Sequence, residues 1–419
     1  MKTKRILYVI ALTFFFDTNG IIDNPHFYKA THFFGEPRLT KNWLTTFDFW
    51  IGTGKTTEGR NSCGMETNIL NIFGEENIKQ LAHGVPQSIL DKSADSFLNN
   101  LWQKRTGDNF GKLRFSGRFK ITEAIIDIQQ NLAIGFFAEL YIPIRKLEIT
   151  DFSFRDLSTK ANAGNANFGQ WQEFIVNIKK NLQPYGIYLQ NTKSTGIGDI
   201  TLLGGYSYSY TETEYLDFID ATLKGGVLFP TGKQRNLHNV FSLPQGYDGH
   251  FGAPIFFDVA FGLYDWMTLG GYASVILFAD KTKNVSMKTS EQQNGFIKLA
   301  HGTADVSLGT IWTAGAFFKA EHFLNGGLSL TLAYRFDKQN KTLIMPCDLK
   351  TFNFKIVNSD PMLDGWNMHT LNFIADYDFA TIDCPNRPHV QVFIDLPIAG
   401  KRIFKTTMVG VGFGIDYAW

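Results

Sequence analysis

Apolar and polar residues alternate over long stretches of the chain. In residues 328–336 the apolar positions are Leu328, Leu330, Leu332, Tyr334 and Phe336, and they alternate with Ser329, Thr331, Ala333 and Arg335. Successive side chains of a β-strand point to opposite faces, so this pattern predicts a strand with one apolar and one polar face.

The same alternation recurs along most of the sequence and predicts twelve strands. Their approximate ranges are 40–52, 112–129, 132–151, 197–212, 216–230, 251–264, 266–280, 303–322, 327–340, 364–379, 387–398 and 404–419. The connections between them alternate in length: short turns near 131, 212–214, 265, 325–326 and 381–386 alternate with longer connections, of which only 399–403 is brief.

This segregation of loop lengths is typical of outer-membrane barrels, which have short periplasmic turns and longer outside loops. A soluble β-sandwich has no reason to show it. A closed barrel is also the all-strand structure that satisfies every backbone group in lipid. Residues 40–419 are therefore expected to form an all-β fold, a transmembrane antiparallel up-and-down barrel in a bacterial outer membrane.

Two long loops, 53–111 and 152–196, contain helical rather than strand periodicity. The apolar positions are Leu90, Ala94, Phe97, Leu98 and Leu101 in the first loop, and Trp171, Phe174, Ile175, Ile178 and Leu182 in the second. Apolar residues at this spacing predict short amphipathic helices. Such helices are expected to cap the barrel mouth, or to act as a gate.

The N-terminal region has the features of an export signal. An apolar run from Ile6 to Phe16 follows Lys2, Lys4 and Arg5, and it is shorter than the roughly 18 residues of a membrane-spanning helix. Residues 1–20 are predicted to be a signal peptide and residues 21–39 an N-terminal segment. A buried strand or core helix is the alternative.

The last strand alternates to the end of the chain. Val409, Val411, Phe413, Ile415, Tyr417 and Trp419 form one face, and glycines with Asp416 form the other. Phe413, Tyr417 and Trp419 resemble the C-terminal insertion signal of bacterial outer-membrane barrels, which implies delivery to the barrel-assembly machinery. The alternative, a soluble edge strand with an exposed apolar face, would be prone to aggregation.

Composition excludes several functional classes. The formal charge of +1 gives no field to attract nucleic acid, and charged residues make up 19% of the chain. Gly52–Thr56 lacks the spacing of a P-loop, and no hydrolase, zinc-protease or paired-cysteine motif occurs. We expect no enzyme activity, no catalytic residues, no metal and no cofactor.

Charged residues on predicted strands are candidates for the lumen and for solute selectivity. They are Arg114, Arg118, Lys120, Glu139, Arg145, Asp258, Asp305, Lys319, Arg335 and Asp395, with Asp220, Lys224 and Asp376 as further members. Arg114, Arg118 and Lys120 share one face of their strand. A charge on the lipid side costs about 2–4 kcal/mol, so this basic ladder is expected to point inward and to favour anions.

The three cysteines leave two alternatives open. Cys63 and Cys347 fall in predicted outside loops, so a disulfide between them is allowed, while Cys384 falls in a short turn. Three unpaired thiols are the other interpretation.

A middle stretch carries a family resemblance. Gly196-Ile197-Gly198-Asp199, Pro230-Thr231-Gly232-Lys233 and Leu243-Pro244-Gln245-Gly246 follow each other in an order that resembles the porin-like family named after the MetA pathway of phenol degradation. The resemblance covers about residues 195–280. It implies a small outer-membrane barrel that passes small, often hydrophobic molecules. Pro230 suits a strand end, because it cannot donate to a ladder, so the motif is interpreted as architectural.

The sequence thus predicts a monomeric channel or transporter, surrounded by outer-membrane lipid, for passive passage of small molecules. The alternative is a filled structural or adhesive barrel whose outer loops bind a partner. The sequence does not identify the solute.

Overall fold

The computed structural model describes residues 44–78, 110–132, 135–160, 165–211, 215–291, 293–323, 327–379 and 386–418. The predicted signal peptide, the segment 21–39, the first predicted loop helix, Cys384 and Trp419 lie outside these residues.

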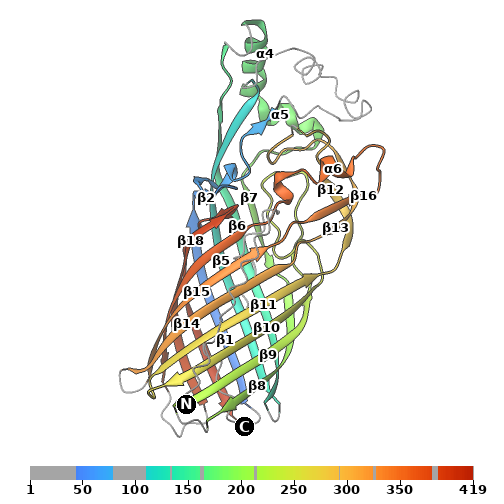
Figure 1. Cartoon of the computed structure of the whole chain (residues 1–419). Helices are drawn as coiled ribbons and strands as arrows, with labels where there is room; N and C mark the ends of the chain where they lie inside the picture. Colours follow the sequence, from blue (N-terminus) through green and yellow to red (C-terminus); the bar gives the residue numbers. More distant parts are fainter. Residues whose placement is uncertain are drawn as a thin grey trace, which may run out of the picture.

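Twelve antiparallel strands form a closed barrel, as the alternation predicts (Figure 1). They are β1 (Leu44–Thr56), β5 (Lys112–Asn131), β6 (Phe136–Asp156), β8 (Ile200–Tyr210), β9 (Phe218–Phe229), β10 (Gly252–Leu263), β11 (Met267–Phe278), β14 (Ile311–Phe323), β15 (Leu328–Gln339), β17 (Asn367–Asp378), β18 (Asn386–Lys401) and β20 (Met408–Ala418). β1 pairs with both β20 and β5, and β5 pairs with β6, which closes the ring. No helix in the described part of the chain is long and apolar enough to cross a membrane.

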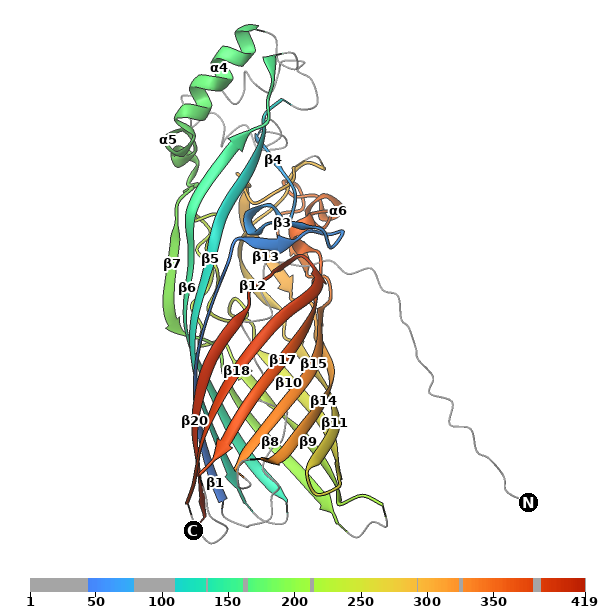
Figure 2. The same cartoon turned by 90° about the vertical axis from the view of Figure 1, so that its left-hand side faces the viewer.

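The long connections gather at one end of the barrel, here called the upper end (Figure 2). Two small sheets lie there: β12 (Lys281–Ser286), β13 (His301–Ser307) and β16 (Leu343–Pro346) form one, and β19 (Ile403–Phe404), β2 (Glu58–Arg60) and β3 (Glu66–Asn68) form the other. The remaining short elements are β4 (Glu76–Asn77), β7 (Thr192–Ile197), α4 (Asn165–Val176), α5 (Ile178–Leu182), α6 (Phe354–Val357), η2 (Ile69–Asn71), η4 (Gln183–Tyr185) and η5 (Pro361–Leu363). The start of β1 and the end of β20 lie at the opposite, lower end.

The second loop contains the predicted helices. Trp171, Phe174, Ile175, Ile178 and Leu182 are all buried on the inner side of α4 and α5, in a cluster with β5 and β6. The helical spacing therefore identified the face that packs on the barrel.

One predicted strand is two elements. Residues 303–322 divide into β13, which pairs with β12 and β16 above the barrel, and the barrel strand β14. Gly309 lies between them, where its N–H donates to Thr342 Oγ1 (3.3 Å) and its carbonyl accepts from Gln339 Nε2 (3.1 Å). These bonds hold the chain in a bend that alternation cannot reveal.

A belt of exposed apolar side chains surrounds the barrel. On β20 the outward residues include Phe413, Ile415 and Tyr417, while Gly410, Gly412 and Asp416 point inward. Phe413 is 55% exposed and Tyr417 is 49% exposed, so the predicted lipid face of the last strand is confirmed. An apolar belt of this kind suits hydrocarbon and not water.

The two longest strands reverse the polarity of their faces partway up. In the lower half of β5, Ile126 and Ile128 point outward and Asp127 points inward; in the upper half, Phe119 and Ile121 are buried inside the structure. β6 changes at the same level, where Ile144 is followed on the outer face by Lys146. Above the membrane the outer face meets water and the inner face is covered by loops. The outer face there therefore carries polar residues, and the inner face carries apolar ones.

Phe413→Lys is expected to destabilise the barrel by about 2–4 kcal/mol, because it places a charge on the lipid face near the midplane. Thr407→Lys is the matched control, because Thr407 is an exposed residue on the same side of the chain beyond the belt. We expect about 0–1 kcal/mol there. Unfolding of the two variants in lipid vesicles by urea provides the free energies, and equal losses would contradict the assignment of faces.

Candidate functional site in the barrel lumen

Most of the predicted lumen residues do point into the barrel. Direct cross-strand partners share a face of the sheet, and the register groups the inward-pointing side chains. The predicted residues in this group are Glu139, Arg145, Asp220, Lys224, Asp258, Lys319, Arg335, Asp376 and Asp395. Their role in selectivity stays a prediction.

The basic ladder of β5 is on the other face. Arg114, Arg118 and Lys120 point outward, on the part of β5 above the apolar belt, so the prediction that they line the lumen is wrong. Their outward direction carries no lipid penalty, because this half of the strand is taller than the membrane. Asp305 is also outside the lumen, because it lies in β13, where its carboxylate accepts a hydrogen bond from Thr282.

Two fully buried ion pairs connect strands inside the barrel, one between the paired strands β5 and β6 and one between β6 and β9, on either side of β8. Lys224 Nζ lies 2.8 Å from Glu139 Oε2, and both side chains are at most 2% exposed. Arg145 pairs with Glu123 at equal burial, and its Nη1 donates to the carbonyl oxygen of Gln245 (3.0 Å). A buried charge is tolerated only with a partner, so these pairs fix β5, β6, β9 and the loop after β9 relative to one another.

A third group of charges lies on the opposite wall. Arg335 Nε is 2.7 Å from Asp337 Oδ2 on β15, and Asn372 Nδ2 donates to Asp395 Oδ1 (2.6 Å) between β17 and β18. The partner residues in these contacts are Glu123, Lys224, Asp337 and Asn372. The alternation predicts that Lys224 points inward. It does not predict this for Glu123, because the apolar face of β5 changes from outward to inward partway up the strand.

The inward face carries an excess of carboxylates. Among the described barrel strands the inward acids are Asp48, Glu123, Asp127, Glu139, Asp156, Asp220, Asp258, Glu321, Asp337, Asp376, Asp378, Asp395 and Asp416. The inward Lys and Arg residues are Arg145, Lys224, Lys319, Arg335 and Arg387. Carboxylates therefore outnumber Lys and Arg on the inward face, and the basic ladder that was expected to favour anions is not part of that face.

Aromatic side chains also occupy the lumen, in two clusters on opposite walls. Leu203, Phe256, Tyr272, Phe317 and Ala333 form one, and Trp50, Ile125, Tyr141, Ile374 and Phe393 form the other. The second cluster crosses β20 at its inward glycines. A Cβ at Gly412 would overlap the indole of Trp50, so glycine leaves the space that the ring fills.

The three motifs of the family resemblance meet in one hydrogen-bond network beneath the upper end. Asp199 Oδ1 accepts from the Gly232 N–H (2.9 Å), and Asp199 Oδ2 accepts from the Tyr247 N–H (2.6 Å). Thr231 Oγ1 donates to the Gly198 carbonyl (2.7 Å). β9 ends at Phe229, so Pro230 does stand at a strand end, and the contacts support an architectural interpretation of the motif.

A roof of loop residues covers the upper end. Its main apolar cluster combines Leu70 of η2, Trp171 of α4, Phe241, Phe296 and Phe404, which come from five different connections. The Phe296 ring lies 5.5 Å from that of Phe73 and 5.7 Å from that of Phe241, measured between centroids. The roof is thus one packed unit rather than a set of separate loops.

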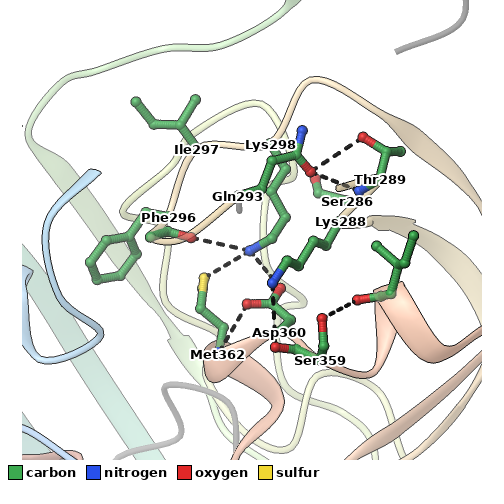
Figure 3. A network of polar contacts seen from close by, with 12 residues as sticks. Ser286, Lys288, Thr289, Gln293, Phe296, Ile297, Lys298, Ser359, Asp360 and Met362 are labelled. Carbon is green, nitrogen blue, oxygen red and sulfur yellow. Dashed lines mark hydrogen bonds and ion pairs between the residues drawn. The ribbon is translucent and has the colours of Figure 1, made fainter. Parts of the chain in front are cut away.

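Polar contacts inside the roof join two of these connections to a further one, between β15 and β17, and Figure 3 shows the contacts of Lys298 and Asp360. Lys298 Nζ lies 2.6 Å from Asp360 Oδ2 and also donates to the Gly295 carbonyl (3.1 Å). The carboxylate of Glu76, on β4, accepts the backbone N–H groups of Phe296 and Ile297. Glu76 is 1% exposed, and burial raises its pKa to about 7 although both N–H groups act in the other direction.

Of the two alternatives for the cysteines, the structure has unpaired thiols at the two described positions. Cys63 and Cys347 are free and exposed, so the possible bridge between them is not formed. Cys63 lies in the turn between β2 and β3, whereas Cys347 follows β16 in the other small sheet.

Comparison with known proteins identifies the architecture. No protein-family model matches the chain, and no curated protein is similar to it in sequence. An outer-membrane channel of Pseudomonas putida F1 is 10% identical, with a TM-score of 0.51 over 93% of this chain and 100% of its own. The translocator domain of the autotransporter NalP of Neisseria meningitidis is 9% identical, with a TM-score of 0.35 over 91% of this chain and 90% of its own. The chain thus has the fold of a bacterial outer-membrane barrel.

Lys224→Met is expected to cost about 3–5 kcal/mol, because it leaves the Glu139 carboxylate buried without this cation. Lys224→Met combined with Glu139→Leu should recover most of that loss. Lys319→Met is the control, because its partner Glu321 is 28% exposed and the pair contributes about 1 kcal/mol or less. The free energies of unfolding are measured in detergent, and a double variant as unstable as the single one would refute the coupling.

Glu76 should make the roof weaker as the pH rises. Its pKa is near 4.5 when unfolded and about 7 in the structure, so its stabilising effect is complete below about pH 4.5 and is lost above about pH 7. Amide exchange at Phe296 and Ile297, corrected for intrinsic rates, should show opening easier by up to about 3 kcal/mol at high pH. Glu76→Gln should remove this dependence and Glu75→Gln should not; a dependence that survives in Glu76→Gln would exclude Glu76 as its origin.

Proposed function

We propose that the protein is an outer-membrane channel for the passive passage of small molecules, in which the lumen is the route and the roof controls access from outside. The observation that carries this proposal is the charged lower lumen, in which side chains remain partly exposed. Two ion pairs show this: Asp48 is 15% and His389 14% exposed, and Lys319 is 20% and Glu321 28% exposed. A barrel with only a structural role has no need for partly exposed charges in its interior.

The aromatic clusters suit solutes with apolar surface when the packing around them opens. The rings of Trp50, Phe393, Phe256 and Phe317 are at most 5% exposed, so a molecule with an apolar body and a polar or cationic group must displace neighbouring side chains to contact them. The hydrogen bonds around Asp199 join the three motifs on which the resemblance to the MetA-associated porin-like family rests, and the similarly folded protein of Pseudomonas putida F1 is described as a channel.

The second candidate is a filled barrel whose loops bind a partner. The tightly packed roof favours it, because Phe241, Phe296 and the Lys298–Asp360 pair leave these loops mutually fixed. Conductance of the refolded protein in planar bilayers separates the two. A protein that stays silent even when residues 165–182 are deleted would favour the filled barrel.

The orientation, assembly and oligomeric state follow as proposals. With the upper end outside and the lower end in the periplasm, the short turns and both barrel termini face the periplasm, as in other barrels of this type. We expect a monomer that is inserted by the barrel-assembly machinery through its last strand. Surface protease on intact cells should then cut within 161–193 and spare the turn at 325–326.

The channel should prefer cations. In a bilayer with asymmetric salt, the reversal potential is expected to lie on the cation side, because inward carboxylates outnumber inward Lys and Arg. Asp220→Asn combined with Asp258→Asn should move it toward zero, since both side chains face the lumen on neighbouring strands. Arg114→Glu combined with Arg118→Glu should leave it unchanged, because those residues are outside. A shift with the second pair instead would show that solutes pass the β5 outer face.

A further inference from the structure

The outer face of the tall wall formed by β1, β5, β6 and β7 changes from apolar to basic at one level. Its last apolar row across the four strands is Ile51, Ala124, Ile144 and Ile197. Two residues further up, the row is Thr53, Thr122, Lys146 and Thr195, and the next row is Lys55, Lys120, Glu148 and Lys193. The cations therefore stand directly above the edge of the hydrocarbon.

This wall continues above the rest of the barrel toward α4 and α5 (Figure 2). Its basic rows face away from the lumen, so they are not part of the proposed route. At that height a side chain on the outer face meets the headgroups of the surrounding lipid rather than acyl chains.

The basic rows have more cations than the protein itself neutralises. Lys146 is paired with Glu148 (3.1 Å), and Arg118 is paired with Asp151 (3.0 Å). Lys55, Lys120 and Lys193 form no ion pair with any residue in the described ranges of the chain. Three positive charges remain available on one face.

The register even places like charges opposite each other. Lys55 is the direct cross-strand partner of Lys120, and Arg114 is the direct partner of Arg155 on the same outer face higher up. Like charges at such positions destabilise a sheet. An external anion that contacts both lysines would remove the repulsion.

We propose that this face binds the phosphate groups of lipopolysaccharide, the glycolipid of the outer leaflet. Its paired phosphates on an acylated sugar match both features of the wall: the acyl chains lie against Ile51, Ile144 and Ile197, and the phosphates lie against Lys55, Lys120 and Lys193. The inference rests on the proposed orientation, in which the upper end faces outward.

The test uses the refolded full chain in detergent micelles and lipid A that carries both phosphates, with bound lipid counted by native mass spectrometry. Lys55→Gln, Lys120→Gln and Lys193→Gln together should weaken binding at least about tenfold, since each lysine near an anionic headgroup contributes on the order of 1 kcal/mol. The matched control replaces Lys350, Lys355 and Lys401 by Gln, because these lysines are exposed and none of them lies on β1, β5, β6 or β7. It should bind like the unaltered protein.

Two further arms identify the ligand. Dephosphorylated lipid A should bind at least about tenfold more weakly than the bisphosphate to the unaltered protein, and free pyrophosphate at equal concentration should not displace the lipid. Equal binding by the triple variant, equal binding of dephosphorylated lipid A, or displacement by pyrophosphate would each overturn the proposal. Migration of unheated protein in SDS verifies that each variant is folded. Conductance is measured separately, so failure of this inference and failure of the channel proposal are distinct results.

Discussion

Lipid offers a peptide group no hydrogen-bond partner, and the rest of the structure depends on that constraint. Every strand that crosses the membrane must have a neighbour on both sides, and the ring closes only because β1 joins β20 to β5. Closure then divides all side chains of the twelve strands into two sets with different surroundings. The outward set becomes the apolar belt, and the inward set brings carboxylates, cations and aromatic rings into one narrow space.

Within that space, ion pairs fill some parts of the interior and packed aromatic rings fill others. The Lys224–Glu139 and Arg145–Glu123 pairs hold charges that could not be buried singly, and the inward glycines of β20 allow Trp50 and Phe393 to lie across the wall. Lower down, charged side chains such as Asp48 and Glu321 stay partly exposed. The lumen thus combines buried ion pairs in its upper part with partly exposed charges in its lower part.

At the upper end, contacts between several loops hold them together as one packed unit. Glu76 holds the backbone at Phe296 and Ile297, and Lys298 continues the contact to Asp360, so connections that are distant in sequence form one roof. The outer surface of the wall beside this roof is basic. β5 and β6 extend above the other strands. Loops cover the inner faces of their upper halves, and the outer faces there carry the cations that are proposed to meet lipid headgroups.

The sequence by itself determined the number of strands, their alternation, the helices of the second loop and the lipid face around Phe413, because period and loop length are local properties of the chain. It placed Glu139, Arg145 and Asp395 in the lumen correctly for the same reason. It could not place Arg114, Arg118 and Lys120, because alternation defines two faces without saying which surroundings each face meets. Only the tertiary structure decided that, since the level of the membrane relative to β5 depends on the strands it pairs with. Contacts between distant segments likewise decide which residues form ion pairs, as Glu123 does with Arg145 and Lys224 with Glu139. They also decide the break between strands at Gly309 and the free state of Cys63 and Cys347.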